Sequence, residues 1–215
     1  MGVTLDELLV ADRPEAWRAC GFRVEADVCV VGEVRIRFMP EQGSKGLVGW
    51  ALGGVTAEEI DGLATTRGLQ PPPEAAPPQP NGITAIDHVV VISSDLDRTV
   101  LAAREAGLDL RRIREEPTPA GAPRQAFFRL GGVILEVIQA PPDAIARSGG
   151  DRPAFFWGLA FVAPDLEATV ASLGERAGEV RAAVQPGRQI ATVRRSAGLG
   201  LPVALMSPPV ELDPD

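Results

Sequence analysis

The chain has 215 residues, 45% of them hydrophobic, which is enough for one substantial core or two small ones. Its formal net charge of −8 makes nucleic acid and anionic membrane surfaces poor partners, and no local basic patch offsets this charge. No apolar stretch approaches the ~20 residues of a membrane-spanning helix, and the N-terminus lacks the basic region and apolar core of a secretion signal. We therefore expect a soluble cytoplasmic protein.

Residues 1–70 carry a pattern of strands and one helix that is weaker than the patterns later in the chain. Residues 5–10 can form a strand, and residues 14–20 a short helix with Asp12 as its cap. The apolar stretches DVCVV and VRIRFM then flank a tight turn, and LVGWALGGV can be a further strand.

The end of this region predicts a second helix, followed by a linker. Thr56 and Glu59 belong to a capping box for a helix that runs to about Thr65. Residues 71–82 are dense in proline and have no apolar periodicity, which predicts an extended surface connector. Residues 141–153 form a second, shorter linker that contains Ser-Gly-Gly.

Residues 83–141 have the clearest pattern. A β-branched run at 86–92 predicts a strand, and Asp95 can cap an amphipathic helix at 96–106. Three strands follow, and a Gly-Gly pair makes the tight turn between the last two. These strands are expected at 108–114, 125–130 and 133–139. The order is βαβββ.

Two residues are unusual for the strands in which they lie. His88, the only histidine, lies in the first strand, and Glu136 lies in the apolar stretch VILEVI of the fourth. Because an unpaired buried carboxylate is costly, Glu136 implies a partner, and His88 is a candidate. A histidine and a glutamate on adjoining strands are also half of a first-row metal site. The alternative is a core histidine and a carboxylate satisfied by backbone or water.

The last segment, residues 154–209, repeats the plan of the preceding module. FFWGLAFVAPDLEATVASLG aligns with IDHVVVISSDLDRTVLAAREAG, which puts Gly158 at the position of the histidine. GLGLPVALMSPP aligns with RLGGVILEVIQAPP, which puts Ala204, or Val203 if the register slips, at the position of the glutamate. None of these residues binds a metal, and their small size is expected to leave room for a pocket.

The first region fits the same plan in a degenerate form. When its turn is aligned with the Gly-Gly turn, Arg37 falls at the position of Glu136. Glu7 falls at the position of His88 if its first loop is shortened by two residues.

The stretch DHVVVISSDLDRTV, followed after a βββ pattern by LGGVILEVIQAP, resembles one module of the vicinal oxygen chelate superfamily. This superfamily includes glyoxalase I, bleomycin-resistance proteins and extradiol dioxygenases, and the resemblance covers about residues 83–209. It implies an α+β fold in which paired βαβββ modules form a cupped mixed sheet, here with a degenerate N-terminal βαβββ-like module. In the family a histidine on the first strand and a glutamate on the fourth bind the metal, which marks His88 and Glu136 as candidate ligands.

The resemblance also implies further ligands that the last module does not supply. The dioxygenase pattern needs two histidines and a carboxylate, the glyoxalase I pattern needs four ligands, and the epimerase pattern needs a second histidine, whereas this chain has one histidine. We expect either no cofactor or one weakly bound divalent metal ion. Such an ion would be held by His88 and Glu136 and completed by water, substrate or a neighbouring subunit.

The family's other mode, typified by bleomycin-resistance proteins, is binding a small molecule without a metal. Candidate residues lining the groove between the modules are Phe127 and Arg129 on the third strand, Trp157, and Arg194 or Arg195. For each aromatic residue the alternative is core packing, and for each arginine it is a solvated face.

Three functional hypotheses follow. The first is a metal-independent protein that binds a small molecule. The second is a metal-dependent lyase, isomerase or dioxygenase-like enzyme with His88 and Glu136 as catalytic residues, His88 acting as a general base. The third is an interaction module whose pocket is vestigial and plugged by Trp157. Three modules are an odd number for a fold that pairs them, so we expect a homodimer, unless the first module packs on the outer sheet or stands apart.

Overall fold

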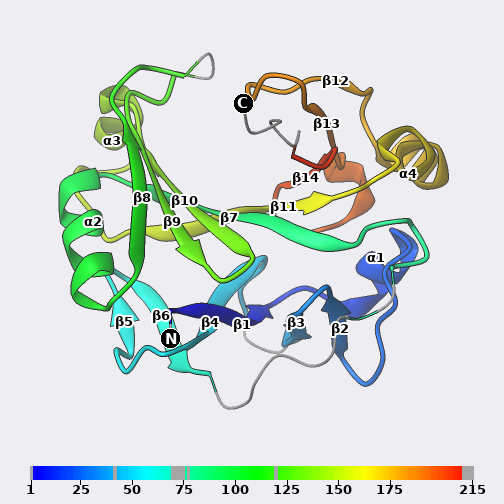
Figure 1. Cartoon of the computed structure of the whole chain (residues 1–215), viewed down its shortest axis with the longest axis horizontal. Helices are drawn as coiled ribbons and strands as arrows, with labels where there is room; N and C mark the ends of the chain where they lie inside the picture. The colour runs from blue at the N-terminus through cyan, green and yellow to red at the C-terminus, as the bar shows by residue number, and fades with distance from the viewer. Residues whose placement is uncertain (1, 41–42, 69–75, 77, 119–120, 210–215) are drawn as a thin grey trace, which may run out of the picture.

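Two mixed sheets, one packed beneath the other, make up the protein (Figure 1). The computed structural model describes residues 2–40, 43–68, 76, 78–118 and 121–209. The C-terminal two thirds of the chain form an eight-stranded sheet that curls into a cup, and the N-terminal region forms a six-stranded sheet under it.

The eight-stranded sheet contains two βαβββ modules in the order β12-β13-β14-β11-β7-β10-β9-β8. The first strands of the two modules, β7 and β11, pair antiparallel at its centre, and each pairs in parallel with the last strand of its own module. The first module comprises β7 (Ala85–Ser93), α2 (Leu96–Glu105), β8 (Asp109–Arg114), β9 (Gln125–Leu130) and β10 (Val133–Gln139). The second comprises β11 (Phe155–Val162), α4 (Leu166–Leu173), β12 (Arg181–Ala182), β13 (Gln189–Thr192) and β14 (Val203–Met206).

Local signals place the elements of the first module, and the first strand, helix and last strand of the second, where the sequence predicts them. The side chain of Asp95 accepts a hydrogen bond from the Arg98 amide and so caps α2, and Asp165 caps α4 in the same way. Gly131 adopts a φ of +67° in the turn between β9 and β10, a conformation that glycine takes without strain. The predicted cupped sheet of paired βαβββ modules is confirmed.

The six-stranded sheet repeats this arrangement in a reduced form, in the order β2-β3-β1-β4-β6-β5. Its central pair, β1 and β4, is antiparallel, and each of these strands has a parallel partner on its other side. The degenerate N-terminal module is therefore itself a pair of half-modules, of which only the first has a helix. Its elements are β1 (Thr4–Val10), α1 (Pro14–Ala19), β2 (Val28–Val31), β3 (Val34–Phe38), β4 (Leu47–Gly53), β5 (Glu59–Ile60) and β6 (Leu63–Arg67).

The prediction of a helix from the capping box at Thr56 is wrong, because β5 and β6 form a hairpin there. Asp61 and Gly62 adopt φ values of +48° and +88° at its turn, and Asp-Gly is a favoured pair for two positive φ angles. Ile60 and Leu63 on either side of the turn are buried. The turn chemistry and tertiary burial thus override the capping pattern.

The two predicted linkers are also more structured than expected. Residues 142–147 form α3 (Pro142–Arg147), with proline in its first turn and an Asp143–Arg147 ion pair of 2.7 Å between successive turns. At the end of the proline-rich linker, the buried Gln79 donates to the Val30 carbonyl at 2.7 Å, and the buried Asn81 donates to the Cys20 carbonyl at 2.8 Å. Residues 71–75 and 77 of this linker lie outside the described residues.

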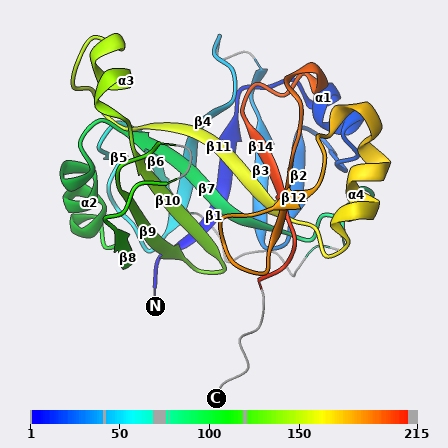
Figure 2. The same cartoon turned by 90° about the horizontal axis from the view of Figure 1, so that it is seen from above.

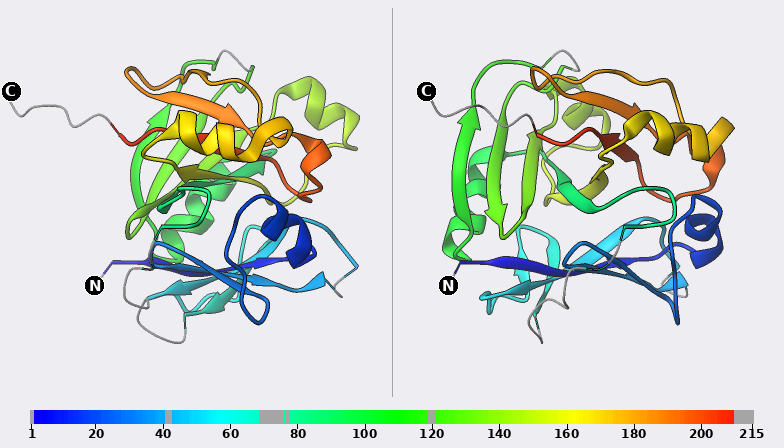
Figure 3. Two further views of the ribbon diagram at one scale, coloured as in Figure 1. Left: turned by 90° about the vertical axis from the view of Figure 1, so that its right-hand side faces the viewer. Right: turned by 45° about the vertical axis from the view of Figure 1, so that its right-hand side comes forward.

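Aromatic side chains join the two sheets in one core. Trp17 of α1 is fully buried, and its ring centroid lies 6.3 Å from that of Phe161 on β11. Trp50 of β4 makes an edge contact of 5.1 Å with Phe156. Figures 2 and 3 show the N-terminal sheet as a separate layer beneath β7 and β11, so this region packs on the outer face of the cup.

A buried carboxylate also links the layers. Asp12 does not cap α1 as predicted, because the capping position belongs to Arg13, which makes no side-chain cap. Instead, Asp12 accepts hydrogen bonds from the Trp17 indole at 3.0 Å, the Gly46 amide at 2.9 Å and the Gly200 amide at 2.8 Å. It therefore ties α1 to a loop of each sheet.

None of the described helices is long and apolar enough to cross a membrane.

Candidate functional site

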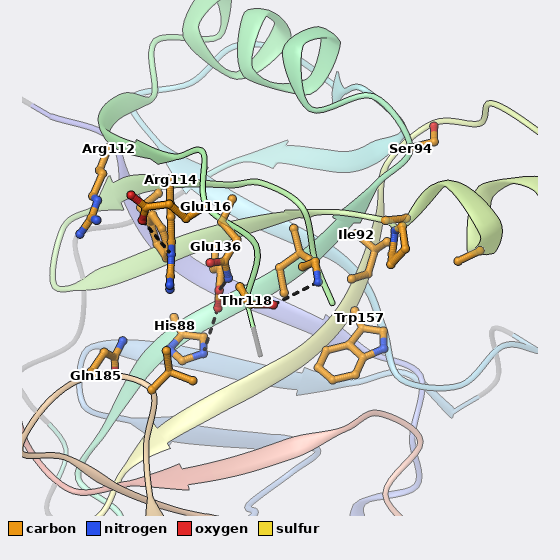
Figure 4. A pocket seen from close by; sticks show the side chains of 18 of the residues that line it. His88, Ile92, Ser94, Arg112, Arg114, Glu116, Thr118, Glu136, Trp157 and Gln185 are labelled. Carbon is orange, nitrogen blue, oxygen red and sulfur yellow. Dashed lines mark hydrogen bonds and ion pairs between the residues drawn. The ribbon is translucent and has the colours of Figure 1, made fainter. Parts of the chain in front are cut away.

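A cavity of about 1020 Å³ lies in the cup of the eight-stranded sheet (Figure 4). Its size is at the upper end of the range for cavities that enclose small organic ligands, ~300–1,000 Å³. Strands β7 to β11 supply the floor, while α3 and the loop at residues 183–186 supply much of the wall. The cup therefore encloses a space large enough for an organic molecule of drug size.

His88 and Glu136 meet on the floor of this cavity. In the parallel pairing of β7 with β10, His88 lies opposite Ile134 and Glu136 lies opposite Val90, so the two side chains stand on the same face. The His88 Nε2 and Glu136 Oε2 atoms are 3.5 Å apart, and the side chains are only 16% and 15% exposed. Figure 4 shows the two groups pointing toward one another. The predicted proximity of these residues is thus what the structure shows.

A chain of polar contacts extends from this pair in both directions. Asp87 accepts a hydrogen bond from the Nδ1 atom of His88 at 2.7 Å, and the Arg188 guanidinium donates to the other Asp87 oxygen. At the far end, Gln125 donates to Glu136. Because a carboxylate only accepts, the Nδ1 atom carries a proton, and Nε2 is the imidazole atom that faces Glu136 and the cavity.

This environment moves the pKa values of the two carboxyl groups in opposite directions. Burial raises the pKa of Glu136, and the negative charge of Asp87 raises it further. The charge interaction with His88 and the hydrogen bond from Gln125 lower this pKa but do not outweigh burial. Burial would also raise the pKa of Asp87, but the hydrogen bonds and charges of His88 and Arg188 outweigh burial and lower it. Asp87 is thus the stable carboxylate, and Glu136 is the group that holds a proton more readily.

Sequence analysis missed three members of this chain: Asp87, Gln125 and Arg188. Asp87 directly precedes the only histidine, a spacing that could have pointed to it. Gln125 is a polar residue that opens an apolar strand, which is a weaker signal. Arg188 lies 101 residues from Asp87, and nothing in the sequence connects the two.

The register of the second module places Gly158 and Ala204 at the positions that His88 and Glu136 occupy in the first. Gly158 pairs with Val90, Ala160 pairs with His88, and Ala204 pairs with Ala160. The expectation that these small residues open the pocket is wrong, because neither lines the cavity. A Cβ atom on Gly158 would come within 2.7 Å of the Pro202 carbonyl oxygen, so the glycine allows close approach of backbone instead.

The same positions in the N-terminal sheet hold an ion pair. Glu7 pairs with Arg35 in the register of β1 and β3, as His88 pairs with Ile134. Glu7 and Arg37 are therefore the counterparts of His88 and Glu136, and their side chains form an ion pair of 2.7 Å.

The structure brings two of the four predicted ligand-binding residues to the cavity. Phe127 and Trp157 line it, and Trp157 is 46% exposed, so it does not plug the space. Arg129 is not among the lining residues and is exposed near the end of β9. Arg194 is also absent from the lining, since its guanidinium donates to the Ala177 carbonyl at 2.9 Å.

Two other arginines take their place. Arg112 and Arg114 of β8 line the cavity, and neither was among the candidate residues that the sequence indicated. A β-bulge at Arg111 separates Leu110 from Arg112 in the pairing with β9. Because a bulge changes which side chains share a face, this orientation could not be deduced from simple alternation.

Comparison with solved structures identifies the fold. A xylose isomerase-like TIM barrel/4-hydroxyphenylpyruvate dioxygenase fusion protein matches 99% of this chain with a TM-score of 0.62 and 13% identity, and the match spans 50% of that protein. The fold is that of the vicinal oxygen chelate proteins. No protein-family model and no curated protein sequence matches the chain.

Two structures of methylmalonyl-CoA epimerase also match part of the chain. The enzyme from Mycobacterium tuberculosis has 20% identity over 60% of this chain and 90% of its own, with a TM-score of 0.49. A second, in complex with methylmalonyl-CoA and NH4+, has 20% identity over 61% of this chain and 99% of its own, with a TM-score of 0.48.

Vicinal oxygen chelate proteins often bind a divalent metal ion, but the donor set of this cavity does not complete such a site. His88 and Glu136 offer one nitrogen and one oxygen, while the counterpart positions hold Gly158 and Ala204. Asp87 contacts the opposite nitrogen of the imidazole. Among the described residues no group of three or more His, Cys, Asp and Glu side chains is arranged to hold a metal. Two donors are fewer than the three or four protein ligands typical of zinc sites.

Proposed function

We propose that this protein binds a small organic molecule in the cup of its vicinal oxygen chelate fold and does so without a metal ion. The observation that carries the proposal is the 1020 Å³ cavity with the His88–Glu136 pair on its floor. Apolar walls with a few converging polar groups are typical of small-molecule sites. The partner is therefore a small molecule, in preference to another macromolecule.

The polar chain suits binding because it is preorganised. Asp87 fixes the imidazole of His88, and Gln125 fixes the carboxyl group of Glu136. A ligand that reaches the floor meets one imidazole nitrogen and one carboxyl oxygen, both already oriented. Groups held in this way lose little conformational entropy when a ligand binds.

Acid–base catalysis is a second candidate function, favoured by one observation. The hydrogen bond to Asp87 leaves His88 Nε2 facing the cavity, where it can accept a proton from a bound molecule. Replacing His88 by Ala would abolish turnover in this case. Unchanged turnover of any substrate found would exclude this role.

A thermal-shift screen with a cavity-blocking variant tests the binding proposal. Ala144 and Ala146 lie on α3, but only Ala144 lines the cavity, so Ala144→Trp blocks it and Ala146→Trp is the matched control. After treatment with a chelator, we expect members of a metabolite and drug library to raise the melting temperature of the wild type and of Ala146→Trp by a few degrees, ~2–4 °C. Ala144→Trp should not respond.

Two outcomes would contradict the proposal. The first is that stabilisation by the compounds survives in Ala144→Trp, since the compounds would then bind elsewhere. The second is that stabilisation appears only when a divalent metal ion is restored, which would favour the metal-dependent enzyme.

A further inference from the structure

We propose that the ligand is an amphiphilic anion: a molecule with a flat apolar body that lies against Trp157, and a carboxylate or similar anionic group that Arg112 and Arg114 receive. This inference rests on the proposed function, because it assigns a ligand class to the same cavity. It follows from the unequal distribution of charge and apolar surface along the cavity.

One end of the cavity carries guanidinium groups with unused hydrogen-bonding capacity. Arg112 and Arg114 lie opposite Phe127 and Gln125 in the pairing of β8 with β9, so both stand above the end that holds Glu136. The Nε atom of Arg114 is buried and donates to no acceptor among the described residues. Its nearest ion-pair partner, Glu116, is 3.8 Å away, beyond hydrogen-bond length.

An unpaired buried donor favours a ligand that can accept from it. Leaving such a donor unsatisfied costs free energy, and the cost is larger for a charged group. A carboxylate fits the planar fork of a guanidinium with two parallel hydrogen bonds. A neutral ligand that offers no acceptor would leave the buried Nε atom of Arg114 unsatisfied.

Among the described residues, no carboxylate of the cavity accepts a hydrogen bond from the Nε atom of Arg114. Glu136 is engaged by Gln125 and His88. The Glu116 side chain is 80% exposed and therefore largely in water. Asp87 is paired with Arg188. The buried Nε atom of Arg114 therefore lacks an acceptor, which favours an anionic ligand at this end of the cavity.

The other end of the cavity is richer in apolar side chains, although Arg152 also lines it and lies over the ring of Phe155. Trp157 and Ile92 lie there, well separated from Arg112 and Arg114 in Figure 4. Trp157 is the extra residue of a β-bulge between Phe156 and Gly158. Such a bulge changes the direction in which a side chain points. Three large hydrophobic side chains are exposed in the described part of the chain, and two of them, Trp157 and Val184, line this cavity. Exposed aromatic surface inside a cavity favours stacking with a flat apolar group.

A pair of matched dyes separates the anionic group from the apolar body. 8-Anilinonaphthalene-1-sulfonate carries one sulfonate, and N-phenyl-1-naphthylamine has the same ring skeleton without it. We expect the wild type to bind the sulfonate about tenfold more tightly than the neutral dye in fluorescence titrations, with a preference that falls as salt is added. Ala144→Trp should bind neither dye, and Ala146→Trp should bind both.

Arg114→Gln tests the residue that receives the anion. It should weaken binding of the sulfonate about tenfold and leave binding of the neutral dye unchanged. Arg114→Lys, which keeps the charge but loses the planar fork, should retain part of the preference. Arg111→Gln is the matched control, because Arg111 lies at the bulge, pairs with Asp109 at 3.2 Å and does not line the cavity.

The outcomes distinguish this inference from the proposed function. Equal affinity of the wild type for the two dyes, or equal losses in Arg114→Gln and Arg111→Gln, overturns the anionic ligand class and leaves cavity binding intact. If neither dye binds the wild type, or if Ala144→Trp binds both dyes as the wild type does, both proposals fall.

Discussion

The side chain of Glu136 is where burial and charge compete most directly. It lies at the end of the chain of contacts that begins at Arg188, and its pKa is raised mainly because burial disfavours its charged form. The ionised form of Glu136 therefore lowers the stability of the folded state. The hydrogen bond from Gln125 partly compensates this loss. Polar groups that cost stability in this way are common at functional sites.

The raised pKa predicts a pH-dependent effect of Glu136→Gln. The folded state binds the proton of this carboxyl more tightly than the unfolded state, so this residue favours folding at low pH and does so less as the pH rises through its folded pKa. Glu136→Gln should therefore increase the free energy of unfolding at pH 7 to 8, and the gain should shrink toward pH 4. Urea unfolding at a series of pH values measures it.

Glu115 provides the opposite case as a control. Its hydrogen bond with Arg124 lowers its pKa, so it favours folding at neutral pH and less as the pH falls. Glu115→Gln should lower the free energy of unfolding at pH 7 compared with the wild type, and this loss should be smaller at pH 3. A pH-independent difference between Glu136→Gln and the wild type would contradict the assignment of a raised pKa.

At the scale of elements, the β5–β6 hairpin holds the first sheet to the second. Asp61 at its turn accepts a hydrogen bond from Arg98 Nε of α2 at 2.8 Å and another from Thr99. Gly62, next to it, lies against Pro153 and Ala154 at the entry to β11. The tight turn thus positions a short hairpin against α2 and against the residues that lead into β11.

Gly62→Ala should destabilise the protein by at least about 2 kcal/mol. An added Cβ atom would clash with the Pro153 Cβ atom and lie 2.9 Å from the Ala154 carbonyl oxygen, in addition to the strain of its φ of +88°. Gly107 has a similar φ of +91° but nothing within 4 Å of its Cβ position, so Gly107→Ala should cost only about 1 kcal/mol. Equal losses for the two variants in urea unfolding would show that the contacts at Gly62 do not matter.

At the scale of the whole molecule, the two sheets share one hydrophobic core. Buried residues from β1, α1 and β4 belong to the same cluster as those of β7, β10 and β11. The domain division predicted at residues 71–82 stays a prediction, and the parts on either side of it share one core. The homodimer also stays a prediction, but its argument from an odd number of modules is lost, because the N-terminal region pairs two half-modules within itself.

A shared core predicts a single unfolding transition that is sensitive to the contact between sheets. Trp17→Ala should lower the free energy of unfolding by about 3–5 kcal/mol, because the indole is fully buried against Phe161 of the other sheet. Trp157→Ala, at a residue that is 46% exposed, should cost less than about 1 kcal/mol.

Circular dichroism and tryptophan fluorescence should follow the same transition in both variants and in the wild type. Two separate transitions, or a small loss in Trp17→Ala, would mean that the sheets unfold independently.

The sequence by itself determined the elements of the first βαβββ module, the repeat of its plan at residues 154–209, and the proximity of His88 and Glu136. Capping side chains, β-branched runs and a Gly-Gly turn act within a few residues of one another. They can therefore be recognised in the sequence without knowledge of tertiary contacts. The proximity of His88 and Glu136 can be predicted in the same way, because the first and last strands of one βαβββ module lie side by side. The alignment of Gly158 with His88 likewise depended on a local repeat.

Only the tertiary structure decided what surrounds that pair. The bulge at Arg111 turns Arg112 and Arg114 into the cavity, and the bulge at Trp157 exposes its indole there, whereas alternation along a strand predicts neither. Arg188 reaches Asp87 across a separation of 101 residues, and the N-terminal sheet packs on the outer face of the cup through aromatic contacts distant in sequence. Such contacts depend on how complete surfaces fit together, which no local pattern of residues encodes.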